Sequence, residues 1–308
     1  MGAVRRHMQR DVLGQASAAT LGAYAAFVLL GAIPLAADGD WTVGAEAGVR
    51  HDNNVGNAQL SSDIVADTLI DARVSISRLF TLDDGYSMTV GGDLGGESYH
   101  RLTGLNNVSL DAAIALKRKW GLGAFAPWAR TAVSVARSSY DDSYRNAWDY
   151  RATLASGRRF DERWNFWADY TYENRAASPQ EEEVPGLSGD AFSQVSHSLG
   201  INLEYSLMES SYLALGLLAR HGDVVSTTLQ PNATVYYPSS ALADDPAFGP
   251  NAYAYKLTGT TYGFRAGLRF SPTEHSLLGC GFERFETHAD GGNEYAKSIV
   301  DVTWNYRY

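Results

Sequence analysis

Hydrophobic and polar residues alternate along most of this chain. The segment WTVGAEAGVR, residues 41–50, places Trp, Val, Ala, Ala and Val at odd positions and Thr, Gly, Glu, Gly and Arg at even positions. The segment SQVSHSLGINLEYSL, residues 193–207, repeats this pattern. A period of two is typical of β-strands with one apolar and one polar face. We identify twelve such runs: 40–51, 64–80, 86–99, 107–119, 127–139, 147–160, 164–176, 193–207, 211–224, 253–270, 276–288 and 296–308.

These runs are too long for ordinary soluble strands. Most span 12 to 17 residues, whereas soluble strands usually have about 5–6 and a tilted membrane-spanning strand needs about 9–11. Short connections such as DER and MES alternate with longer polar segments, of which 177–192 and 225–252 are the longest. The pattern predicts an all-β protein: a single antiparallel up-and-down transmembrane β-barrel of about 12 strands, with short periplasmic turns and long extracellular loops.

Aromatic residues cluster near both ends of the predicted strands, as expected for the two interfacial girdles of a membrane barrel. Near the short turns lie Phe80, Trp120, Trp128, Phe160, Trp164, Phe166 and Phe270. Near the long loops lie Tyr99, Tyr140, Trp148, Tyr172 and Tyr253. The alternative is a soluble antiparallel sandwich, or a lipocalin-like barrel with its apolar face inward. That alternative requires twelve unusually long strands.

The first residues differ in composition from the rest. Basic Arg5, Arg6 and Arg10 precede an apolar stretch that ends in PLAA before residue 38. This order predicts a secretory signal peptide over 1–37, followed by an outer-membrane β-barrel over 38–308 in a Gram-negative cell. A retained membrane anchor is the alternative. A secreted barrel of this kind is expected to contact outer-membrane lipid and lipopolysaccharide.

Charge and cysteine content exclude other functions. The net charge of −10 disfavours binding to nucleic acid, because the phosphate backbone repels an acidic protein. The single cysteine, Cys280, gives neither a disulfide framework nor a cysteine-rich metal site. We therefore expect no cofactor and no metal. The acidic stretch Glu181 to Glu183 with Asp190 could bind divalent cations, but a hydrated loop is the preferred interpretation.

If the apolar positions of each strand face lipid, the alternating polar positions face the lumen. A lipid-facing Arg or Lys costs about 2–4 kcal/mol at the bilayer midplane, so the charged positions must point inward. They either pair across strands and fill the interior, leaving a narrow passage, or they form a selectivity lining for solutes. The predicted lining residues are Glu46, Arg50, Asp67, Asp71, Arg73, Asp93, Glu97, Asp111, Lys117, Arg130, Asp149, Arg151, Asp169, Glu173, Arg175, Glu204, Arg265, Arg269 and Asp301.

No catalytic constellation emerges from the sequence. His197 and Ser198 are adjacent, but neighbours on a strand point to opposite faces and cannot form a nucleophile–base pair. His288 and Asp290 lie near a loop, where acidic residues are usually solvated. We predict that the protein is not an enzyme, and we keep an outer-membrane hydrolase as a second alternative only.

One stretch near the start of the predicted barrel resembles a motif of known outer-membrane barrels. The residues HDNNVGNA resemble a D-[SDN]-N-[VI]-N-x-A stretch in the barrels of surface lipoprotein assembly modifiers and of exopolysaccharide-export systems, through Asp52, Asn53, Asn54, Val55, Asn57 and Ala58. The resemblance to outer-membrane barrels as a class implies a narrow channel or export-associated pore for small or oligomeric solutes, because twelve-stranded members include channels for nucleosides and acidic oligosaccharides. The alternative is a non-conducting barrel that acts through its loops.

The final segment VDVTWNYRY alternates to its last residue. In a closed barrel this strand pairs with the first strand, and its lipid face ends in aromatic rings. The pattern is similar to the signal read by the outer-membrane barrel assembly machinery, which implies that this machinery is a partner. The residues that carry the resemblance are Val302, Trp304, Tyr306 and Tyr308.

Overall fold

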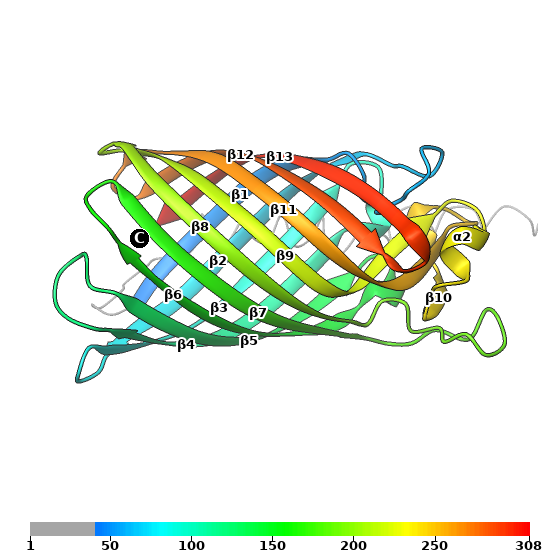
Figure 1. Ribbon diagram of the computed structural model, residues 1–308, viewed down its shortest axis with the longest axis horizontal. Helices are drawn as coiled ribbons and strands as arrows, with labels where there is room; N and C mark the ends of the chain where they lie inside the picture. The colour runs from blue at the N-terminus through cyan, green and yellow to red at the C-terminus, as the bar shows by residue number, and fades with distance from the viewer. Residues whose placement is uncertain (1–40) are drawn as a thin grey trace, which may run out of the picture.

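The computed structural model describes residues 41–308. The predicted signal peptide 1–37 lies outside the described residues. The described chain is a closed, antiparallel, up-and-down barrel of twelve strands (Figure 1). The barrel strands are β1 (Trp41–Asp52), β2 (Asp67–Thr81), β3 (Tyr86–Tyr99), β4 (Asn107–Lys119), β5 (Trp128–Tyr140), β6 (Ala147–Arg159), β7 (Trp164–Ala177), β8 (Gln194–Met208), β9 (Ser211–Thr228), β11 (Tyr253–Thr273), β12 (Ser276–Ala289) and β13 (Asn293–Arg307).

Consecutive strands form hydrogen-bonded neighbours around the whole barrel. A short strand, β10 (Ala241–Asp244), lies in the connection between β9 and β11, so β11 pairs with β9, β12 and β10. The ladder closes between β1 and β13, whose register runs from Gly44 opposite Arg307 to Asp52 opposite Ile299. The predicted strand positions are confirmed. The main differences are at the long-loop ends of β9 and β13, where pairing continues beyond the predicted limits.

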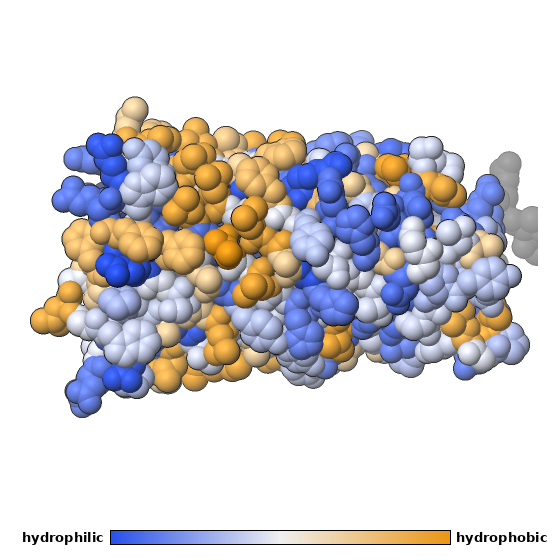
Figure 2. Space-filling view, viewed as in Figure 1, coloured by the Kyte–Doolittle hydropathy of each residue, from blue (hydrophilic) through white to orange (hydrophobic). Residues whose placement is uncertain are grey.

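The apolar parity forms the outside of the barrel. Leu110, Leu154 and Val302 are 63%, 55% and 58% exposed, which a soluble protein would avoid over so many strands. Figure 2 shows apolar side chains gathered in a band toward one end of the barrel, with a more polar surface at the other end. The C-terminus lies at the end nearer the band (Figure 1). The band therefore marks the lipid-facing zone, and the polar half rises above it.

No helix in residues 41–308 has the length and apolar character required of a membrane span.

The predicted aromatic girdles are partly wrong. Tyr140 points into the barrel, where the guanidinium of Arg175 lies 5.3 Å from the centre of its ring. Tyr99 shares the inward parity of Glu97, and Trp128 shares that of Arg130. Of the predicted loop-end rings, that of Trp148 faces outward, as do those of Tyr150, Tyr170 and Tyr262, which were not predicted; these four are 40–57% exposed. Proximity to a loop did not distinguish the two faces, because only strand parity does.

The connections also depart from a simple short and long alternation. Strands β12 and β13 are joined only by the 3₁₀ turn η4 (Asp290–Gly292), although this connection was predicted to be long. The opposite rim carries a longer segment over 120–127. The other loop-end connections contain η1 (Thr103–Leu105), η2 (Ser143–Arg145), the helix α2 (Ala233–Tyr236), β10 and η3 (Pro246–Phe248). They are folded structures, and they lie together over one end of the barrel (Figure 1).

Candidate functional site

The barrel encloses a series of cavities. Four of them have volumes of about 330, 590, 470 and 690 Å³. Neighbouring cavities share lining residues: Arg220 lies between the first and second, Arg265 between the second and third, and Glu46 between the third and fourth. The fourth reaches the short-turn rim beside His275 and Arg307. The lumen thus holds a series of adjoining cavities, the last of which lies at the short-turn rim.

Ion pairs between neighbouring strands brace the lumen wall. Arg151 of β6 contacts Glu173 of β7 at 2.6 Å, and Arg175 of β7 contacts Asp149 of β6 at 3.0 Å. Both pairs join residues directly opposite each other in the β6–β7 register, where opposite charges stabilise a sheet. Four further inward pairs are Arg73–Asp93 at 3.5 Å, Arg265–Glu283 at 3.3 Å, Arg50–Glu97 at 4.0 Å and Lys297–Asp52 at 3.1 Å. These side chains support the wall and leave the cavities open between them.

Most of the predicted lining residues border these cavities or a smaller adjoining one. They are Glu46, Arg73, Asp93, Asp111, Arg130, Asp149, Arg151, Asp169, Glu173, Arg175, Glu204, Arg265, Arg269 and Asp301. Arg50 and Glu97 pair with each other across β2. The ammonium of Lys117 lies 4.9 Å from the ring centre of Trp128, and the carboxylate of Asp71 fills the space beside Gly48.

Asp67 has a different role from the predicted one. It is only 4% exposed, and its carboxylate accepts hydrogen bonds from the backbone N–H groups of Thr68, Arg101 and Leu102. A carboxylate held by several backbone donors fixes the local chain. Asp67 therefore anchors the β3–β4 loop to the start of β2, and it borders none of the cavities described above.

Three inward charges were missed by the sequence prediction: Arg220, Glu283 and Lys297 line the second cavity. Parity could have found Arg220 and Glu283, since both alternate with outward apolar residues on β9 and β12. Lys297 lies near the loop end of β13, where the outward residues are polar and parity is harder to recognise. It pairs with Asp52 of β1.

The loop between β9 and β11 packs over the extracellular mouth with a small apolar core. Strand β10 pairs with β11 beyond the end of β12, and a parallel bridge joins Ala241 to Ser188 of the β7–β8 loop. One core contains Val224, Val235, Leu242, Tyr255 and Leu257, and a second contains Ala191, Phe192, Ala241, Ala243 and Ala254. The loops thus form a packed cover and are not extended, solvent-exposed segments.

A buried ion pair holds this cover to the far side of the mouth. Asp245, which is fully buried, receives hydrogen bonds from Arg145 at 2.6 and 3.3 Å and from the Thr227 hydroxyl at 2.7 Å. Arg145 lies between β5 and β6, whereas Asp245 lies between β9 and β11. The Arg145 guanidinium also stacks 4.5 Å from the ring centre of Phe192. The pair with its ring contact therefore connects three extracellular loops.

Asp142 lies beside this pair, but its carboxylate makes no close contact with a cation. Burial raises the pKa of Asp142, and a hydrogen bond from the backbone N–H of Tyr144 offsets only part of that increase. Its carboxylate lies 3.8 Å from Arg145, too far for a hydrogen bond. Arg145 is therefore matched mainly by Asp245.

The motif of residues 52–58 forms a tight turn that reaches β9. Asn54, only 1% exposed, donates to the Ala58 carbonyl and accepts from the Ala58 N–H. Asn57 adopts a left-handed φ of 52° and donates to the Val225 carbonyl at 3.0 Å. Asn tolerates this conformation better than most residues. The loop from β1 therefore also contributes to the cover. No comparison tests the resemblance of this stretch to the two barrel families, which stays a prediction.

The residues considered for catalysis are not brought together. His197 lies on the outward parity of β8, with its Nδ1 2.7 Å from the Tyr170 hydroxyl, whereas Ser198 lines the second cavity. His288 pairs with Glu294 on the outer surface. Within residues 41–308, no group of three or more His, Cys, Asp or Glu side chains is arranged to hold a metal ion.

Comparison with known proteins supports the fold. No protein-family model matches the sequence, and no curated protein matches it significantly. Among solved structures, an outer membrane channel from Pseudomonas putida F1 has 12% identity and a TM-score of 0.59, with 87% of this chain and 96% of that chain covered. The NanC porin has 10% identity and a TM-score of 0.43 over 86% of this chain and 98% of that chain.

The closed barrel, its exposed apolar band and its polar interior are features of a protein that spans a membrane. A closed barrel satisfies every backbone hydrogen bond inside a bilayer, where no water is available. The solved structure with a TM-score of 0.59 is an outer membrane channel, which shares this fold. The protein is a transmembrane β-barrel of the outer-membrane type.

Proposed function

We propose that the protein is a narrow, passive channel for small polar solutes. The observation that carries this proposal is the series of adjoining cavities along the lumen, each of which has charged and hydroxyl side chains in its lining. A polar lining replaces part of a solute's hydration, whereas an apolar interior would exclude it. A passive pore conducts in either direction, so the same geometry serves uptake or an export-associated role.

Recording of the refolded protein in planar bilayers tests the proposal. We expect small, discrete conductance steps, because a twelve-stranded barrel is narrower than the sixteen-stranded porins and its mouth is covered. A chain without residues 231–250, with the flanking ends joined by a short Gly-Ser linker, should give larger steps. Complete absence of steps from correctly folded protein of both forms would contradict the proposal.

The second candidate is a non-conducting barrel that acts through its loops. It is favoured by the packed cover, whose apolar clusters and buried ion pair go beyond what is needed to connect strands. The same recordings separate the two functions. A barrel that binds through its loops should show no current in either form, while a covered channel should conduct once the loop is shortened.

A further inference from the structure

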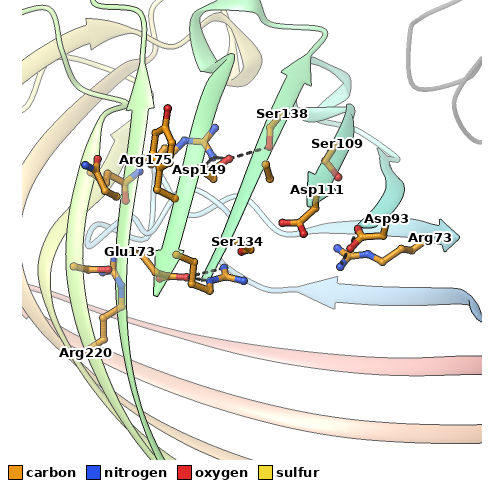
Figure 3. A pocket seen from close by; sticks show the side chains of 16 residues that line it. Arg73, Asp93, Ser109, Asp111, Ser134, Ser138, Asp149, Glu173, Arg175 and Arg220 are labelled. Carbon is orange, nitrogen blue, oxygen red and sulfur yellow. Dashed lines mark hydrogen bonds and ion pairs between the residues drawn. The ribbon is translucent and has the colours of Figure 1, made fainter. Parts of the chain in front are cut away.

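The first lumen cavity contains charged groups that form no ion pair with the barrel wall. Arg73, Arg151 and Arg175 each pair with a carboxylate within this cavity. Among the described residues, neither Asp111 nor Arg220 takes part in an ion pair, although both line the same space. Figure 3 shows these two side chains on different walls of the cavity.

The acidic side of the cavity is formed by β3 and β4. Asp93 and Asp111 are directly opposite each other in the β3–β4 register, an arrangement of like charges that destabilises a sheet unless a cation lies nearby. The Oδ1 atom of Asp93 is buried and accepts no hydrogen bond, and its closest cation, Nη1 of Arg73, is 3.5 Å away. Asp111 accepts a hydrogen bond from the Ser134 hydroxyl and interacts electrostatically with Arg73 and Arg151, without an ion pair to either. This side can accept an additional N–H donor.

The basic side is Arg220 on β9. Five barrel strands separate β3 from β9 in each direction around the barrel, so these two strands face each other across the lumen. One guanidinium nitrogen of Arg220 donates to the backbone carbonyl of Asp223 at 2.9 Å, which fixes the side chain. The carboxylates of Glu173 and Asp223 interact electrostatically with the guanidinium but form no ion pair with it. Its remaining donors are suited to a carboxylate, which guanidinium groups bind bidentately.

The geometry points to a binding site for zwitterionic solutes, with an ammonium at Asp93 and Asp111 and a carboxylate at Arg220. Amino acids and short peptides with free termini form this chemical class. A solute with one charge can pair with the groups on one wall only, and it leaves the charge on the opposite wall without a partner. A zwitterion can pair with the groups on both walls. The inference rests on the proposed channel function and specifies which solutes the channel favours.

Current block by three probes of similar size tests this site. Diglycine carries both charges, N-acetyldiglycine only the negative charge, and diglycinamide only the positive charge. We expect diglycine to reduce the ionic current at concentrations at least about tenfold below those of the other two, as loss of a charge-assisted hydrogen bond implies. Arg220→Gln and Asp111→Asn should each abolish this preference, and Arg220→Lys should retain part of it.

Arg269→Gln is the matched control, because Arg269 lines the third cavity and not the first; it should keep the preference for diglycine. Heat-modifiable migration on gels confirms that each variant is folded. If Asp111→Asn does not fold, the comparison of Arg220→Lys with Arg220→Gln still tests the site. Equal block by all three probes in the wild type overturns the inference, and so does an unchanged preference in Arg220→Gln.

If neither the wild type nor the form without residues 231–250 carries current, the channel proposal fails and the site is tested separately. Calorimetric titration of the detergent-solubilised barrel with the same three probes measures binding directly. Binding of diglycine that is lost in Arg220→Gln supports the site in a non-conducting barrel. Absence of diglycine binding overturns it.

Discussion

At the scale of single residues, the effect of a buried charge on stability depends on whether an opposite charge is paired with it. Asp245 is fully buried and hydrogen-bonded to Arg145 and Thr227. Asp142 lies beside the same guanidinium but makes no close pair with it. Two aspartates next to one arginine therefore have different energetic roles, which substitution can separate.

Replacement of Asp245 by Asn should release the cover. The guanidinium of Arg145 would remain in a mostly buried place without its anion, and breaking a buried pair in this way costs roughly 3–5 kcal/mol. We expect faster chymotrypsin cleavage between β9 and β11, where Tyr236 and Phe248 provide sites, and a larger single-channel conductance. Unchanged protease resistance would show that the apolar clusters hold the loop alone.

Asp142→Asn should have little effect, within about 1 kcal/mol, and serves as the matched control. The raised pKa of Asp142 means that its ionised form costs stability at neutral pH, and that this cost disappears as the pH falls through the folded-state pKa. The variant should therefore lose the part of the loop's pH dependence that comes from this carboxyl. Protease resistance of the loop measured between pH 4 and 7 in wild type and variant checks this expectation.

At the scale of elements, parity along a strand was predictable and loop structure was not. Every strand must show apolar side chains to lipid at alternate positions, so the period of two located all twelve barrel strands. Loops obey no such period. The position of Asp67 under the β3–β4 loop and the ion pair from Arg145 to Asp245 depend on contacts between residues 34 to 100 positions apart. Nothing local in the sequence signals them.

The end of β13 supports a prediction about assembly. The N–H of Tyr308 donates to the Val43 carbonyl at 2.8 Å, while its side chain is 57% exposed on the outer surface. Its ring therefore contributes little to packing, and its role as a signal for the assembly machinery stays a prediction. Tyr308→Asp should lower the amount of folded barrel in the outer membrane several-fold, whereas Tyr308→Phe should not. Quantitative blotting of membrane fractions measures both, and equal levels would count against the role of this residue as a signal.

At the scale of the whole molecule, both signs of charge are distributed around the lumen. The polar interior was predictable, because the cost of placing charge in lipid leaves no other side for it. The charge pattern across the lumen was not, since it depends on which strands face each other after closure. Arg220 and Asp111 come from opposite walls, and their separation along the sequence gave no reason to associate them.

The mixed lining predicts weak selectivity between simple ions. A tenfold KCl gradient across the bilayer should give a reversal potential close to zero, because neither sign dominates the series of cavities. Arg220→Gln should shift the potential slightly toward cation preference, and Asp111→Asn toward anion preference. A wild type with strong preference for one ion would mean that a small part of the lining controls permeation.

The pairing of β1 with β13 also determines the order in which this protein can fold. Every other ladder between consecutive strands is local, but this one joins Gly44 to Arg307, so it forms slowly compared with a hairpin. Until then both strands are open edges that can pair with other chains. The chain is therefore most prone to aggregation after synthesis and before closure. Its yield should depend on periplasmic chaperones more than its final stability does.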